Sequence, residues 1–350
     1  MKALFRILVI TTILTFVFYK YSQNTPAPPA KPDESASYEE WQEYASEALP
    51  RPNKGISTLI GKPALEVAVQ YGEPVRKDLA SDGLEWWVYN KDITTFMMVA
   101  VVDEVVKQVY VAGRDVKTTP FTIGSTLDDV YRTSIVEPEV MLNKDDQLYT
   151  LALSDYDLRH RLLIKFDDIV AQVFINANQA VTAIRFYDYD TIIKTAPYEM
   201  AYYDGATSVN EQDIVPTEAV ARGIEQQVKD LIDVERFYQS LPKYHSNTKL
   251  QQLAQATTTA YLAQEDAEAS LLPLTERAAQ FAIHTTSIVE SIEQMPLDPI
   301  EMVHKMLNEE KGQAVLLQET YTQYGMACVE QTCTHIAAKR EGIATPTLLN

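Results

Sequence analysis

The strongest constraint on the fold is a change in the period of the apolar residues past the middle of the chain. Up to about Tyr198, apolar residues alternate with polar ones in short runs rich in Trp, Tyr, Val and Thr, a pattern typical of strands. From Ala219 onward they recur at three- and four-residue spacing, which is typical of helices. We therefore predict an α+β chain with two folded parts, and 350 residues are enough for both.

The first folded part is expected over residues 55–200 and contains two similar units. Each unit opens with an Ile-Gly pair, Ile60–Gly61 and Ile123–Gly124, continues into a short acidic helix and then enters strand-like runs. The string "NANQ", Asn176–Gln179, predicts a hairpin turn in the second unit. The sequence thus indicates tandem helix-plus-antiparallel-sheet units.

The second folded part is expected over residues 215–345 and combines helices with strands. Helices are predicted over Ala219–Phe237, Lys249–Gln264, Leu274–Glu293 and Pro299–Leu307, followed by a closing strand pair. The strand pair holds both cysteines of the chain, Cys328 and Cys333. They either form a disulfide across a tight hairpin or are two small core residues.

The N-terminus predicts export. Lys2 and Arg6 precede the apolar run Ile7–Tyr19, so we expect a signal anchor over residues 1–21, with the N-terminus in the cytoplasm and the bulk of the chain outside. A cleaved signal peptide, which would make the protein secreted, is the alternative. Residues 22–54 are rich in proline and acidic residues and predict an extended linker.

The charge of the chain excludes one class of partner. The formal net charge is −19 and the isoelectric point is about 4.7. Nucleic-acid binding needs clustered Lys and Arg to neutralise phosphates, so a nucleic-acid partner is not expected. The expected contacts are with the membrane, through the N-terminal helix, and with a protein, a peptide or an envelope component.

The first part resembles the CAP-associated N-terminal domain of exported proteins from Gram-positive bacteria. The resemblance runs in order from about Gly55 to Arg185, and Glu85–Asn90 is its most specific piece. The strings that carry it are "IGKPALEVAVQYGEPVRKD", "EWWVYN", "VVKQVYVAG", "FTIGSTLDDVYR" and "LLIKFDDIVAQVFIN". In that family the domain precedes a CAP domain, the fold of cysteine-rich secretory, antigen 5 and pathogenesis-related proteins.

The second part resembles a CAP domain that has lost its polar site. "MLNEEKGQAVLLQETYTQYGMA", which starts at Met306, is similar to the bacterial CAP string "WLNSxGHRxNLLxxxYTxxGVG". The family's histidine falls on Gly312, its serine on Glu309, and an earlier histidine on Thr257. The family's "GEN" string is expected near Ala278–Ala282, where neither Glu nor Asn stands. The resemblance implies a CAP-like α-β-α sandwich.

The chemical consequence is that the CAP cleft lacks its metal ligands. Imidazole supplies the neutral nitrogen that binds a divalent metal or transfers a proton, and neither Gly312 nor Thr257 replaces it. We therefore expect no metal, no other cofactor and no catalysis in that cleft. Lipid binding there is a further alternative, although the apolar helix faces are better explained as core.

Relocated chemistry is the alternative to lost chemistry. His284 follows the region of the "GEN" string, His304 lies on the helix before Met306, and Glu309 follows it, so these three residues are the candidates for a peptidase-like envelope hydrolase. No "GxSxG", "HExxH" or nucleotide-binding glycine loop occurs in the sequence.

A ligand surface is expected around Trp86, Trp87 and Tyr89. Consecutive residues of a strand point to opposite faces of the sheet, so one tryptophan is core and the other is covered by a helix or faces a partner. The predicted function is therefore that of a membrane-anchored, extracytoplasmic binding protein of the cell envelope.

Overall fold

The computed structural model describes residues 30–33, 35–80, 83–202, 217–264, 271–285, 287–294 and 298–340. Residues 48–350 form one compact unit, and the chain up to Glu47 is a separate one. The latter contains α2 (Tyr38–Ser46), which begins with a capping box between Ser37 and Glu40. The predicted signal anchor, residues 1–21, lies outside the described residues. No helix among those described is long and apolar enough to cross a membrane.

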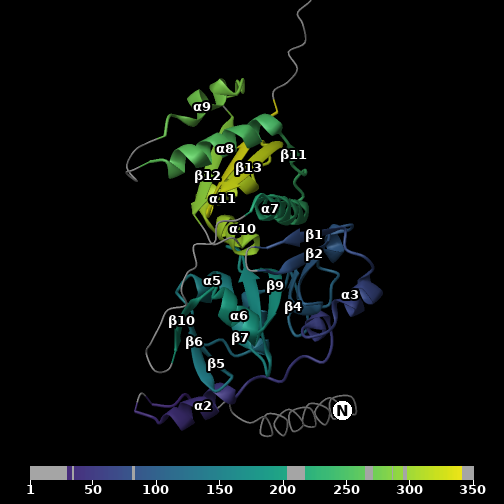
Figure 1. Ribbon diagram of the computed structural model, residues 1–350, viewed down its shortest axis with the longest axis vertical. Coiled ribbons are helices and arrows are strands. Elements are labelled where there is room, and N and C mark those ends of the chain that lie inside the picture. The colour runs from purple at the N-terminus through teal and green to yellow at the C-terminus, as the bar shows by residue number, and fades with distance from the viewer. Residues whose placement is uncertain are drawn as a thin grey trace, which may run out of the picture. The chain divides into compact units, whose positions relative to one another are not determined.

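A seven-stranded antiparallel sheet organises the first part (Figure 1). Its strand order is β1-β2-β3-β4-β9-β8-β7, so the two halves of the repeat meet where β4 pairs with β9. The strands are β1 (Arg76–Leu79), β2 (Glu85–Tyr89), β3 (Met97–Val102), β4 (Val105–Val111), β7 (Arg161–Lys165), β8 (Ile169–Ile175) and β9 (Val181–Asp188).

A helix precedes the strands of each half, as the repeated Ile-Gly pairs predict. These helices are α3 (Ala64–Tyr71) and α4 (Leu127–Thr133), and the glycines before them, Gly61 and Gly124, have φ of 82° and 93°. Short 3-10 turns stand at Ile56–Leu59 and Ile93–Thr95. The predicted hairpin turn joins β8 to β9, where the Asn176 carboxamide oxygen accepts hydrogen bonds from the backbone of Asn178 and Ala180.

A smaller sheet covers part of one face of the large sheet. Its order is β10-β6-β5, and its apolar side packs with Leu163, Val170 and Tyr187 of the large sheet. The elements here are β5 (Glu139–Lys144), β6 (Gln147–Ala152), α5 (Asp157–His160), α6 (Tyr189–Thr195) and β10 (Glu199–Tyr202).

The second part is a three-layer α-β-α sandwich. Its sheet has the order β11-β13-β14-β12, with α8 and α9 packed on one face and α7, α10 and α11 on the other. The elements are α7 (Glu218–Tyr238), β11 (His245–Ser246), α8 (Thr248–Leu262), α9 (Leu274–Gln280), β12 (Ile288–Gln294), α10 (Pro299–Asn308), α11 (Glu310–Leu316), β13 (Gln323–Val329) and β14 (Thr332–Ala338). The predicted α+β fold class is confirmed.

One predicted helix is wrong. The segment Leu274–Glu293 is helical only to Gln280, and Ile288–Gln294 is a strand that pairs with β14. Its β-branched residues Ile288, Val289 and Ile292 favour a strand, and pairing with β14 decides between the two patterns.

The two cysteines are joined. Cys328 and Cys333 face each other across the β13–β14 hairpin and form a disulfide, with 4.1 Å between their Cα atoms. This settles the choice that the sequence leaves open.

The two parts share one hydrophobic core. Trp86, Val88 and Met98 on one face of the large sheet pack in the same cluster as residues of α7 and α10. Trp87 and Tyr89 point to the opposite face, where α3 and α4 lie. Because consecutive side chains of a strand point to opposite faces, Trp86 lies under the helices of the second part, where it is 3% exposed.

We predict that Trp86→Ala lowers the free energy of unfolding by about 3–5 kcal/mol, the range for losing a buried aromatic side chain. Trp87→Ala is the matched control and is expected to cost less, because Trp87 is only half-buried. Urea denaturation followed by circular dichroism measures both. Equal losses would contradict the shared core.

Candidate functional site

Gly312, where the resemblance expects a histidine, has no room for a side chain. A Cβ atom there would lie 2.2 Å from the carbonyl oxygen of Met306, because the start of α11 lies directly against α10. The glycine is therefore required by close backbone packing, and the position contributes nothing to a polar site.

Thr257, the other histidine position, lies in a buried ion-pair cluster. Arg277 donates a hydrogen bond to the Thr257 hydroxyl at 2.6 Å, forms an ion pair with Glu290, and donates to the carbonyl of Leu272 at 2.7 Å. A guanidinium is always charged, so it repels a metal cation. Within the described residues, no three His, Cys, Asp or Glu side chains are grouped to hold a metal ion.

Glu290 is a residue that the sequence analysis missed. The resemblance suggests Ala278–Ala282 for the acidic string, but these residues lie at the end of α9 and in the turn that follows. The carboxylate that reaches the Thr257 cluster instead comes from β12, which the sequence predicts as helix. The β-branched residues around it, Ile288, Val289 and Ile292, are the signal that could have identified this strand.

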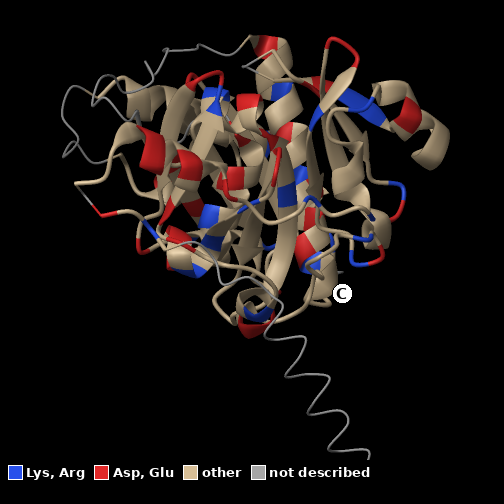
Figure 2. Cartoon of the chain, turned by 90° about the horizontal axis from the view of Figure 1, so that it is seen from below, with Lys and Arg blue, Asp and Glu red and all other residues tan. Residues whose placement is uncertain are grey.

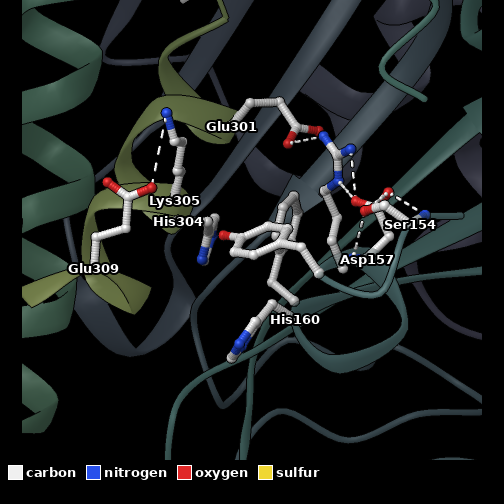
Figure 3. Close-up of a pocket in the computed structure, with 10 residues that line it drawn as sticks. Ser154, Asp157, His160, Glu301, His304, Lys305 and Glu309 are labelled. Atoms are coloured by element: carbon white, nitrogen blue, oxygen red, sulfur yellow. Dashed lines mark hydrogen bonds and ion pairs between the residues drawn. The ribbon is translucent and has the colours of Figure 1, made fainter. Parts of the chain in front are cut away.

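The candidate site is a cavity of about 260 Å³ between the two parts. It brings together two of the three relocated candidates, His304 and Glu309. Figure 3 shows both on the second part, opposite Ser154, Asp157 and His160 of the first. The lining residues are Ser154, Tyr156, Asp157, His160, Arg161, Phe174, Glu301, His304, Lys305 and Glu309.

A buried ion-pair network joins the two parts at one side of the cavity. Arg161 of β7 pairs with Asp157 at 2.7 Å and with Glu301 of α10 at 2.6 Å (Figure 3). The second oxygen of Glu301 accepts a hydrogen bond from Gln172 at 2.7 Å. Burial raises the pKa of Glu301, and the nearby Arg161 opposes that rise.

A row of polar side chains crosses the middle of the large sheet beside this network. Arg185 of β9 donates to Gln108 of β4 and pairs with Asp298, just before α10, at 2.6 Å. Gln172 stands opposite Arg185 on β8. Polar residues in the interior of apolar strands are the sequence signal that could have predicted this interface.

His304 is held rigidly and stays uncharged. Its ring stacks on Phe174 with 3.9 Å between centroids, and its Nε2 lies 2.9 Å from the Tyr110 hydroxyl. Burial, together with the charge of Arg185, lowers the pKa of His304 to about 3. A histidine of this kind is a weak general base near neutral pH.

His160 and Tyr156 form the opposite wall and were not identified from the sequence. Their rings are 4.9 Å apart, and His160 Nδ1 lies 3.3 Å from the carbonyl oxygen of Ile175. Since a carbonyl only accepts, Nδ1 carries the proton and Nε2 is an acceptor in the neutral ring. Burial raises the pKa of Tyr156 to about 12, so its hydroxyl stays protonated.

Lys305 stands between two carboxylates at the edge of the cavity. Its ammonium lies 3.8 Å from Glu309 and 3.9 Å from Glu293. Glu293 accepts a hydrogen bond from Ser291 at 2.5 Å, and burial raises its pKa. The Glu309 side chain is 43% exposed, so it is open to a ligand.

The remaining predicted residues lie elsewhere. His284 is exposed in the loop after α9 and does not line the cavity. Trp86 and Tyr89 are buried, whereas Trp87 keeps an exposed portion beneath Lys77, whose ammonium lies 3.9 Å from the ring centroid. The binding role of these three aromatic residues stays a prediction.

Acidic residues outnumber basic residues in this chain. The chain has 49 acidic and 30 basic residues. In the view of Figure 2, the basic residues lie singly or in small groups among acidic and uncharged segments.

Comparison with protein families confirms the type of the first part. Residues 60–198 match the model of the CAP-associated N-terminal family, so this region is a CAP-associated N-terminal domain. A curated relative, the uncharacterized membrane protein YlbC of Bacillus subtilis strain 168, is 25% identical over 97% of this chain and all of its own length.

Two solved structures share the fold of most of the chain. An extracellular protein containing an SCP domain from Bacillus anthracis superposes with a TM-score of 0.73 at 23% identity. A cysteine-rich secretory protein from Staphylococcus aureus gives 0.74 at 21%. Each comparison covers 84% of this chain and 98% of the other. The CAP-like fold that the resemblance implies is thereby confirmed.

We predict that Arg161→Met lowers the free energy of unfolding by about 3–5 kcal/mol, because Glu301 is left buried without its counter-charge. Adding Glu301→Gln to this variant removes the stranded charge and should restore part of the loss. Urea midpoints of the two single variants and the double variant form the measurement. A strictly additive double variant would show that the two residues do not interact.

The low pKa of His304 predicts a loss of stability in acid. Between pH 6.5 and about 3 the unfolded chain binds a proton at this residue and the folded chain does not, so stability falls as pH falls. In His304→Gln, which can keep the bond to Tyr110, the difference in unfolding free energy between pH 7 and 4.5 should shrink by at least about 1 kcal/mol, roughly one pKa unit. Parallel curves for the two proteins would contradict this role.

Proposed function

We propose that this protein, which has a CAP-associated N-terminal domain and a CAP-like fold, is a membrane-anchored binding protein of the cell envelope. The apolar N-terminal run would hold it in the membrane, with both folded parts outside. The support is that run, the disulfide between Cys328 and Cys333, and relatives described as membrane, extracellular or secretory proteins. The partner is a protein, a peptide or an envelope component, and not a nucleic acid.

The ligand site of this proposal is the cavity between the two parts. The observation that carries it is that both parts contribute polar and aromatic side chains to a single pocket, with the wall fixed by the Arg161–Glu301 pair. A pocket with an aromatic lining, a few convergent polar groups and a rigid frame is the usual form of a binding site. Ligand binding would therefore also strengthen the contact between the two parts.

Binding is favoured over catalysis by the state of the acid–base groups. His304 is neutral, stacked and bonded to Tyr110. Both carboxylates of the network, Asp157 and Glu301, are engaged with Arg161. At the two positions where the family has histidines, Thr257 is bonded to Arg277 and Gly312 is packed against α10. None of these groups is arranged to transfer a proton.

A hydrolase is the second candidate, and one observation favours it. His304 and Glu309, which the sequence analysis names as relocated catalytic residues, line the same pocket. In this alternative Glu309 would act on a water molecule and His160 would replace His284, which lies outside the pocket. A tightly bound metal or turnover of an envelope fragment would favour this alternative.

The proposal predicts that a soluble digest of cell envelope raises the melting temperature of the full-length protein in detergent, through binding to the folded state. Ser154→Trp, which fills the pocket, should abolish the shift. Asp155→Trp is the matched control, since Asp155 is exposed and does not line the cavity. Equal shifts for all three proteins would contradict the pocket as the site.

The same preparation distinguishes the two candidates. We expect no stoichiometric metal by elemental analysis, no thermal shift with Zn²⁺, Ca²⁺ or Mg²⁺, and no new products from the digest. Bound metal, or products whose formation is lost in His304→Gln and Glu309→Gln, would make the hydrolase the better explanation.

A further inference from the structure

The four-stranded sheet of the second part ends in a strand whose outer edge has no partner among the described residues. This strand is β12, which pairs with β14 on one side only (Figure 1). One position beyond the register of the two strands, the N–H of Lys339 donates to the carbonyl of Ser287 at 2.9 Å, so these residues form a hydrogen-bonded pair. Such pairs alternate along an antiparallel ladder, and the N–H and C=O groups of Ile288, Glu290 and Ile292 therefore point away from β14. No described residue hydrogen-bonds to these main-chain groups.

This edge lacks the features by which proteins usually protect an outer strand. Short length, lysine, proline and bulges all hinder the pairing of a further strand. β12 is seven residues long, whereas β11, at the other edge of the same sheet, has two. It contains no proline or lysine, and its register with β14 is regular throughout. Its two charged side chains have partners within the sheet and its helices, since Glu290 pairs with Arg277 and Glu293 accepts from Ser291.

The outer strands of the other described sheets are shorter than β12, and two of them are partly covered. β1 ends against α7, because a Cβ atom on Gly223 would lie 3.3 Å from the carbonyl oxygen of Leu79. β7 is followed by Phe166, which forms an isolated bridge with Leu49. β12 is therefore the described strand beside which a further strand can pair over the greatest length.

Apolar side chains along β12 are only partly buried. Ile288 packs beside the cluster of α8 and α9, and Val289 packs beside the cluster on the opposite face of the sheet. Ile292 is also partly exposed. Side chains that face each other on neighbouring strands lie about 4.5–5.5 Å apart, so a further strand would cover the exposed parts of all three. The edge thus offers main-chain hydrogen bonds together with apolar contacts on both faces.

The charge of the chain favours a basic partner over a second copy. β12 contains Glu290 and Glu293 and no basic residue, and the net charge of the whole chain is −19. Pairing between two copies would bring two strongly acidic proteins together and place like charges on neighbouring strands, which is unfavourable. A segment with lysine or arginine is instead attracted to this chain.

From these observations we infer that the edge of β12 binds an extended, basic segment of a partner protein, which pairs with this strand and enlarges the sheet. The inference goes beyond the proposed function, because no residue of β12 is among those that line the cavity. Aliphatic side chains of the segment lie beside Ile288 and Ile292 on one face and beside Val289 on the other. Main-chain hydrogen bonds supply affinity in this mode of recognition, and the alternate side chains supply specificity.

Two synthetic peptides test this mode on the full-length protein in neutral detergent. The first is Lys-Val-Thr-Val-Thr-Val-Lys with blocked ends. The second has the same side chains but a methyl group on every central amide nitrogen, which removes the N–H donors. Isothermal titration should show the first peptide binding at least tenfold more tightly than the second. Hydrogen exchange followed by mass spectrometry should show that only the first peptide slows exchange in residues 288–294, where free amides become bonded.

Ile292→Thr keeps a branched side chain but removes apolar surface, and should weaken binding of the first peptide severalfold. Leu79→Thr is the matched control, because Leu79 is 54% exposed on β1, an outer strand of the large sheet. It should leave affinity within twofold. Equal affinity for the two peptides, equal weakening in the two variants, or no binding of either peptide would overturn the inference.

Three further results would assign the edge or the peptide differently, and each would also overturn the inference. A dimer of the full-length protein that Ile292→Thr dissociates would make the occupant a second copy. Binding that appears only after deletion of residues 341–350 would assign the edge to the end of this chain. Loss of peptide binding in Ser154→Trp would place the peptide in the cavity, which supports the proposed function instead. Peptide binding that persists in Ser154→Trp, without any thermal shift from the envelope digest, would leave the inference standing while the proposed function fails.

Discussion

The structure depends on how one face of the seven-stranded sheet is covered. The small sheet covers one portion of this face, around Leu163, Val170 and Tyr187, and α7 and α10 cover another portion, which runs from Trp86 on β2 to Phe174 on β8. Without those helices, Trp86, Val88 and Met98 would expose a large apolar surface to water. The CAP-associated domain therefore needs the second part as its hydrophobic cover, and the two act as one body.

Polar residues fix the alignment of that contact. Apolar packing is not directional, but the pairs Arg185–Asp298 and Arg161–Glu301 have one satisfied geometry each. Leaving either arginine without its partner would strand a buried charge. The pocket lies beside this network, between the area that the small sheet covers and the area that α10 covers. The ion pairs that align the two parts therefore also hold the wall of the pocket in place.

The CAP-like half keeps the fold while its polar positions serve packing. Gly312 allows α11 to approach α10. Arg277 links Thr257 to Glu290, so its guanidinium puts a fixed positive charge where a metal cation would otherwise bind. The side chains that converge on a cavity lie at the contact with the first part. Because the polar side chains converge at this contact and not in the CAP cleft, the contact is where we expect a ligand to bind.

The sequence alone determined the α+β class, the tandem units, the hairpin turn at Asn176 and the resemblance to CAP proteins, because these follow from local period, turn residues and linear motifs. It also placed His304 and Glu309 among the candidates. Only the tertiary structure made Ile288–Gln294 a strand, buried Trp86 under α7 and α10, and brought His160 and Tyr156 to the pocket. These outcomes depend on contacts between residues that lie far apart in the sequence, which no local pattern encodes.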